Sequence, residues 1–178
     1  KRSRKSPPMR KRYEKEGIMV QIDGSHHRWF SHKLPHCLTL AMDDATGKIL
    51  GAKFTKTETT FASMEVVKKI IEKHGTFQIL YSDNAGIHGG GKRSGFSNMN
   101  RAMRELDIIP IQANSPQAKG RVERAFRTLQ SRLISELRLN KIENCEEANR
   151  FLEDVYIDKF NAQFAVEPES KETAYKPL

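Results

Sequence analysis

Short runs of apolar and β-branched residues, separated by turn-forming residues, occupy the first third of the chain. Their length and composition predict strands. The three predicted strands are 18–22, 37–42 and 49–55. The stretch 24–30 reads either as a continuation of the first strand or as a looped excursion, and Asp43, Asp44 and Gly47 supply turn chemistry between the second and the third. We therefore expect an antiparallel meander.

Helical and strand-like patterns alternate in the middle of the chain. Thr59 or Thr60 can cap a helix that Gly75 is placed to end. Its expected buried stripe is Met64, Val67, Ile70 and Ile71. A fourth strand is predicted at 78–81, a modest helix at 96–106 and a fifth strand at 108–111, where Pro110 indicates an edge position. A strand–helix–strand connection of this length implies parallel pairing.

Two further helices are predicted in the last third of the chain. Ser115 followed by Pro116 is a helix-entry signal. The helix should extend to about Leu139, and its apolar face comprises Val122, Phe126, Leu129, Leu133 and Leu137. Glu123 falls at the edge of that face. Asn144 with Glu147 resembles a capping box for a last helix. Its expected stripe is Ala148, Phe151, Leu152, Val155, Tyr156 and Phe160.

The predicted order of elements is therefore β-β-β-α-β-α-β-α-α, an α/β class with a mixed five-stranded sheet flanked by helices. Residues 1–16 are rich in Lys and Arg around Pro7-Pro8 and are expected to form a basic flexible arm or linker. Residues 17–165 form the predicted globular core. Residues 166–178 are expected to be an irregular exit toward a further domain, and the start without Met suggests a piece of a longer protein.

Charge changes this picture, because it is unevenly distributed. The net charge is +9; residues 1–140 carry 26 basic and 13 acidic side chains, and residues 141–178 carry 5 and 9. The basic part is where we expect nucleic acid to bind. The apolar runs are too short to span a membrane. Cys37 and Cys145 lie far apart without ligand-like spacing, which is typical of reduced thiols in a cytosolic protein.

Three carboxylates are the candidate chemistry. Asp23 and Asp83 follow the first and fourth predicted strands, which should be neighbours in a mixed sheet, and Glu123 lies on the helix after the fifth. Clustered carboxylates need a counter-charge, and Mg²⁺ binds one or two carboxylates together with water and phosphate oxygens. Two such ions can stabilise both the attacking and the leaving oxygen of a displacement at phosphorus. Each Asp could instead be a plain turn residue, and Glu123 a solvated surface group.

The sequence blocks around these carboxylates resemble the three catalytic blocks of the DDE transposase and retroviral-integrase superfamily, in particular ISNCY-type insertion-sequence transposases. The blocks are 21–25 (QIDGS), 81–85 (YSDNA) and 114–124 (NSPQAKGRVER). The resemblance covers about residues 18–165. It implies an RNase H-like fold and a site for Mg²⁺ or Mn²⁺, two ions when DNA is bound. By similarity, Asp23 bridges both ions, Asp83 holds one and Glu123 the other.

The resemblance also implies a reaction and partners. Water attacks the phosphodiester at the end of a mobile element, and the released 3′-hydroxyl then attacks target DNA. The expected partners are transposon ends, target DNA and further copies of the chain, in the cytoplasm of a bacterium and at its nucleoid. The alternatives are a nuclease of the same fold that cleaves without joining, and an idle DNA-binding or assembly module.

Other residues have weaker interpretations. Lys119, Arg121, Arg124 and Arg127 are candidates for contact with DNA phosphates, although Arg121 and Arg124 project further from Glu123 and read equally well as ordinary surface. Asp43 and Asp44 are expected to be turn formers, and Trp29 and Phe30 core. Five histidines have spacings that fit no familiar metal site. They are His26, His27, His32, His36 and His88.

Overall fold

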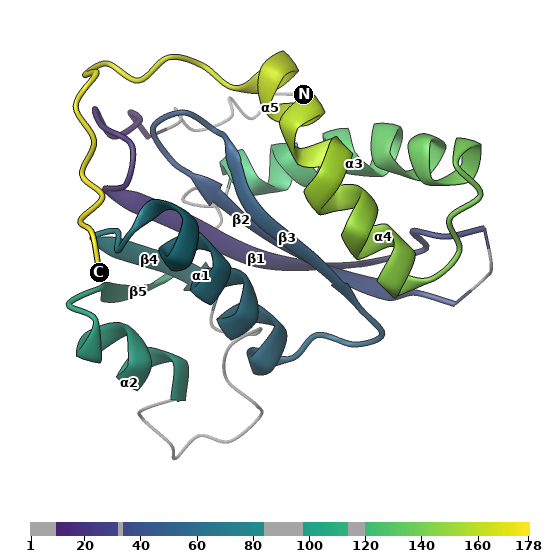
Figure 1. Ribbon diagram of the computed structural model, residues 1–178, viewed down its shortest axis with the longest axis horizontal. Coiled ribbons are helices and arrows are strands. Elements are labelled where there is room, and N and C mark those ends of the chain that lie inside the picture. The colour runs from purple at the N-terminus through teal and green to yellow at the C-terminus, as the bar shows by residue number, and fades with distance from the viewer. Residues whose placement is uncertain (1–9, 32–33, 84–97, 114–119) are drawn as a thin grey trace, which may run out of the picture.

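A mixed five-stranded sheet forms the centre of the protein (Figure 1). The structure is a computed structural model that describes residues 10–31, 34–83, 98–113 and 120–178. The strand order is β3-β2-β1-β4-β5. The strands are β1 (Met19–His27), β2 (His36–Asp43), β3 (Ile49–Thr55), β4 (Ile79–Asp83) and β5 (Ile109–Ala113). β1, β2 and β3 are antiparallel, whereas β4 pairs in parallel with both β1 and β5. The predicted meander, the β1–β4 neighbourhood and the edge position of Pro110 are confirmed.

The first strand continues past Asp23, which is one of the two interpretations given above for 24–30. Asp23 was expected at a strand end, but antiparallel pairing of β1 with β2 extends to the pair His27 and His36. Parallel pairing with β4 ends earlier, at Ile22 and Ser82. Asp23 thus lies inside β1, at the point where pairing with β4 ends and pairing with β2 continues.

Helices cover both faces of the sheet and one of its edges. They are α1 (Thr60–His74), α2 (Asn98–Glu105), α3 (Gly120–Leu139), α4 (Cys145–Phe151), the π-helical turn η2 (Leu152–Tyr156) and α5 (Ile157–Phe164). Val20 and Ile22 of β1 share one core with α1 and α2. Leu38 and Leu40 of β2 share the other with α3 and the α4–α5 helix. Trp29 and Phe30 are buried in this second core, as predicted.

The α4–α5 helix runs alongside β3 and closes the edge of the sheet (Figure 1). The Asn149 amide nitrogen donates to the Phe54 carbonyl (3.1 Å), and its oxygen accepts from the Phe54 N–H (2.7 Å). Asn161 makes the same two bonds to Ile49, at 2.9 and 2.7 Å. Twelve helical residues rise about 18 Å and five strand residues about 17 Å, so the two side chains match the spacing of their targets. Both asparagines satisfy backbone groups that an edge strand leaves open.

The π-helical turn explains why the predicted stripe of the last helix was partly wrong. The Ile157 N–H donates to the Leu152 carbonyl, five residues back. The wider turn acts as a one-residue insertion, so that residues four apart stay on one face. The buried positions are Ala148, Leu152, Tyr156 and Phe160, while Val155 is 48% exposed. The insertion also brings Asn149 and Asn161 to the same side of the helix, because the eleven regular α-helical steps that remain complete just over three turns.

The two ends of the described chain pack against each other. The Ala174 N–H donates to the Glu16 carbonyl, and Thr76 and Lys176 exchange two backbone hydrogen bonds. Lys15 pairs with Glu172 at 2.5 Å. Residues 10–16 of the predicted basic arm contact the backbone of 165–178 and the buried carboxylate of Asp44. Residues 1–9 lie outside the described part.

A pair of substitutions tests the π-helical register. We expect Leu152→Ala to lower the free energy of unfolding by about 2–5 kcal/mol, because it leaves a cavity in the core. Val155→Ala should change it by less than about 0.5 kcal/mol. In a regular α-helix both side chains would share the buried face, so equal losses in urea denaturation would contradict the observed register.

Candidate active site

Asp23 faces the helix α3. Because successive strand residues point to opposite faces and Ile22 packs under α1, Gln21, Asp23 and Ser25 belong to the opposite, α3-covered face. Asp23 is half-buried, and its Oδ1 accepts a hydrogen bond from the Gly24 N–H at 3.0 Å. The Asp23 carboxylate thus lies on the α3-covered face of the sheet, just beyond the point where the pairing of β1 with β4 ends.

Asp83 is the last residue of β4, next to Ala113 on β5. In the parallel register Ile22 lies beside Ser82, so Asp23 and Asp83 occupy the next positions on neighbouring strands. The predicted adjacency of the two strands is observed at the level of the backbone. The side chain of Asp83 lies outside the described part of the structure.

Glu123 is exposed in the first turn of α3. Gln130 lies two turns further along the same edge of the helix, and its Nε2 donates to Ser25 Oγ at 3.3 Å. Because Ser25 is two residues from Asp23 on the same face of β1, this contact places the Glu123 edge of α3 over β1. The predicted entry of the helix, with Lys119, lies outside the described residues.

A buried carboxylate fixes this end of α3. Asp44 has a fully buried side chain, and its Oδ1 accepts from Arg121 (2.5 Å), Arg10 (2.6 Å) and Gln21 (2.7 Å). Its Oδ2 accepts from the backbone N–H of Tyr13 at 3.0 Å. One side chain thereby joins the N-terminal segment, β1 and the start of α3. Asp44 lies in the turn, as predicted, but the ion pairs of its buried side chain were missed.

Asp43, the last residue of β2, closes the turn with its side chain. Its carboxylate accepts from the backbone N–H groups of Gly17 (3.0 Å) and Thr46 (2.8 Å), and also from the Thr46 hydroxyl (2.8 Å). Burial raises the pKa of Asp43, and these hydrogen bonds oppose the shift. The turn prediction is confirmed for this residue.

The cationic candidates on α3 differ in exposure. The side chain of Arg121 is only 13% exposed and is engaged with Asp44. Arg124 and Arg127 are exposed. The structure thus gives Arg121 an internal ion pair, whereas Arg127 lies on the solvent side one turn beyond Glu123.

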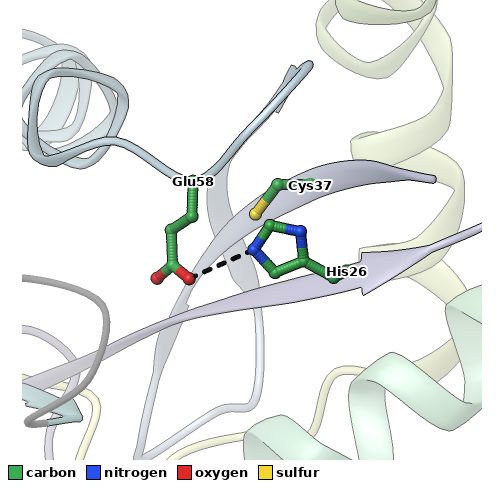
Figure 2. Close-up of side chains that lie close together, drawn as sticks. All are labelled: His26, Cys37 and Glu58. Carbon is green, nitrogen blue, oxygen red and sulfur yellow. Dashed lines mark ion pairs between the residues drawn. The ribbon is translucent and has the colours of Figure 1, made fainter.

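A second group of chemically active side chains lies near Asp23 and was missed. His26 of β1, Cys37 of β2 and Glu58 from the β3–α1 connection point toward one another (Figure 2). His26 Nε2 and Glu58 Oε2 are 3.4 Å apart. Burial, followed by the nearby Glu58 carboxylate, raises the pKa of Cys37 to about 12. The usable signal was the alternative in which 24–30 continues the first strand, because that strand was expected to pair with 37–42 and would bring His26 to the Cys37 strand.

Comparisons with known proteins fit this geometry. No family model matches the chain. The chain is 40% identical over 175 residues to a protein of Sinorhizobium fredii named putative transposase y4bF, and 40% identical over 168 residues to the transposase for insertion sequence IS1202 of Streptococcus pneumoniae. These alignments cover 95% and 90% of this chain. They cover 38% and 36% of the relatives, so the chain spans less than two fifths of their length.

Solved structures share the fold. The integrase catalytic core domain of HTLV-2, solved in complex with magnesium, has a TM-score of 0.60 and 17% identity, covering 82% of this chain and 90% of that one. An intasome of simian T-cell lymphotropic virus contains a chain with a TM-score of 0.63 and 16% identity, covering 97% of this chain and 65% of that one. The predicted RNase H-like fold is confirmed. No helix in the described ranges is long and apolar enough to cross a membrane.

The buried ion pair yields a prediction for stability. We expect Asp44→Asn to lower the free energy of unfolding by about 3–5 kcal/mol, because it leaves the Arg121 guanidinium without its buried counter-charge. Denaturation in urea measures the loss. Asp154→Asn on the exposed face of η2 is the matched control, with an expected change within about 0.5 kcal/mol. Equal values for the two variants would contradict the structural role of Asp44.

Proposed function

Since this chain is related over nearly its whole length to a segment of insertion-sequence transposases, and has the fold of retroviral integrase cores, we propose that it is the catalytic core of a DDE-type transposase. In this proposal the core spans residues 17–165, with 10–16 and 166–178 packed on its surface. The observation that carries the proposal is the register of β1 and β4. The last pair in this register is Ile22 and Ser82, and Asp23 and Asp83 are the next residues on the two strands.

The donor set fits hard divalent cations. Asp23 and Asp83 on neighbouring strands, with Glu123 on the helix edge over β1, would provide carboxylate oxygens, which Mg²⁺ and Mn²⁺ prefer. We propose that these three residues hold two such ions when DNA is bound. The ions would neutralise charge on the attacking and leaving oxygens at phosphorus.

The proposed reaction has two displacements at phosphorus. In the first, water attacks the phosphodiester at the element end; a P–O bond forms, another breaks, and a 3′-hydroxyl is released. In the second, this hydroxyl attacks a phosphodiester of target DNA, so one P–O bond replaces another without further energy input. The proposed partners are element ends, target DNA and other copies of the chain. Exposed Arg127 and Arg124, together with Lys119, would bind phosphates beside the carboxylates.

Oligonucleotides that carry the element end test this function. With Mg²⁺ or Mn²⁺ the protein should yield cleaved and joined products on a sequencing gel. Asp23→Asn, Asp83→Asn and Glu123→Gln should each lower the rate at least about 100-fold, since loss of an outer metal partner alone costs 10–100-fold. The exposed Asp154→Asn and Glu146→Gln are matched controls and should retain activity.

The products also separate the alternatives. Cleavage without joining would support a nuclease of the same fold, and binding without either would indicate a DNA-binding module. Full activity of Asp83→Asn would overturn the assignment of the site.

Arg127 yields a separate prediction for DNA binding. Arg127→Ala should weaken binding and reduce the slope of log K against log salt concentration by about 0.9, as expected when one phosphate contact is lost. Arg138→Ala is the matched control, because this residue is also exposed and lies on the last turn of α3. Fluorescence anisotropy over a salt series measures both slopes. An unchanged slope for Arg127→Ala would remove this residue from the proposed interface.

A further inference from the structure

Three different types of metal ligand lie together near the connection between β1 and β2. His26 and Cys37 are direct partners in the antiparallel register, so their side chains emerge on the same face of the sheet. Glu58 reaches them from the connection between β3 and α1 (Figure 2). One imidazole nitrogen, one sulfur and one carboxylate oxygen all lie within 4.8 Å of one another.

These separations are close to those of a tetrahedral metal centre. With bonds of about 2.0–2.3 Å, the ligands of a tetrahedral zinc ion are about 3.4–3.6 Å apart. The His26 and Glu58 atoms are already 3.4 Å apart. Cys37 is fixed inside β2, whereas the His26 side chain is 52% exposed and can rotate toward the sulfur. Because no separation exceeds 4.8 Å, a contraction of about 1.4 Å or less would complete the three-ligand arrangement.

The backbone leaves room for Glu58 in this arrangement. Gly24 lies two residues before His26 on the same face of β1, where a Cβ atom would be 2.8 Å from Glu58 Oε1 and 3.3 Å from Cys37 Sγ. Any larger residue would push the carboxylate away from the other two ligands. The absence of a side chain at position 24 is therefore part of the geometry of the cluster.

We propose that His26, Cys37 and Glu58 form a binding site for a borderline divalent ion, Zn²⁺, with water as the fourth ligand. Sulfur and imidazole favour zinc over magnesium, so this site differs chemically from the all-carboxylate set proposed for catalysis. It also lies on the other face of the sheet, since Gly24 and His26 alternate with Asp23 and Ser25. On binding, the Cys37 thiol releases its proton to solvent and the sulfur takes up the metal bond.

The bound ion would tie the β3–α1 connection to the β1–β2 hairpin. Glu58 directly precedes Thr59, whose hydroxyl caps α1 by accepting from the Ala62 N–H at 3.1 Å. A metal bond to Glu58 therefore anchors the first turn of α1 to β1, three residues from Asp23. Zinc should stabilise the fold through this link, independently of any DNA chemistry.

Cobalt spectroscopy of the tag-free, chelator-treated protein tests this site directly. Co²⁺ replaces Zn²⁺ and gives a sulfur-to-metal charge-transfer band only when a thiolate binds it. We expect one equivalent of Co²⁺ to produce this band, and Zn²⁺ to displace it. Cys37→Ser should abolish the band, and His26→Ala and Glu58→Gln should weaken Zn²⁺ binding at least about tenfold, since loss of an outer partner alone costs that much.

The chain offers close controls. Cys145→Ser removes the other thiol and His27→Ala the neighbouring histidine, and both should keep the band at full strength. Asp23→Asn should keep it too, which separates this proposal from the one on catalysis. Thermal unfolding without metal verifies that each variant folds. Absence of the band in the folded wild type, or equal Zn²⁺ affinity of wild type and Cys37→Ser, would overturn the proposal; the latter would indicate an adventitious ion only.

Discussion

The buried carboxylate of Asp44 is the interaction on which the arrangement of the site depends. A carboxylate without solvent contact must be compensated by cations and hydrogen-bond donors, and Asp44 obtains them from three parts of the chain. Arg121 comes from α3, Gln21 from β1 and Arg10 from the N-terminal segment. Because Arg121 is only two residues before Glu123, the ion pair that holds the helix also sets the direction in which Glu123 leaves it. The basic residues near the carboxylates therefore differ in role: Arg121 holds the helix through Asp44, whereas the exposed Arg127 is proposed to bind DNA phosphates.

Much of the fold could be predicted from local patterns, because strands and helices differ in period. The bounds of β3 and the neighbourhood of β1 and β4 needed only short apolar runs and the rule for parallel crossovers. For the extension of β1 beyond Asp23 the sequence left two alternatives open, because pairing with β2 decides between them. The exposure of Val155 could not be predicted, because the π-helical turn shifts the buried face of a helix whose sequence pattern is that of a regular α-helix.

The chemistry of the site was predictable to a different degree. Asp23, Asp83 and Glu123 stand in recognisable sequence blocks, so the sequence could nominate them together. His26, Cys37 and Glu58 stand in no such block, because register and a glycine, rather than spacing along the chain, bring them together. Arg121 shows the converse, since its place in a basic run suggested a surface contact and its partner is an acid 77 residues away.

The two asparagines that cover β3 have a consequence for how the protein is made. Asn149 and Asn161 are 95 and 112 residues away from the backbone groups that they satisfy. At about 5–20 residues per second, a ribosome needs about 5–20 seconds to add the residues that separate β3 from Asn161. Throughout that interval the outer edge of β3 presents open hydrogen-bonding groups to other nascent chains. The edge strand β3 is therefore covered late in the synthesis of this domain, and its cover depends on the side-chain amides of Asn149 and Asn161.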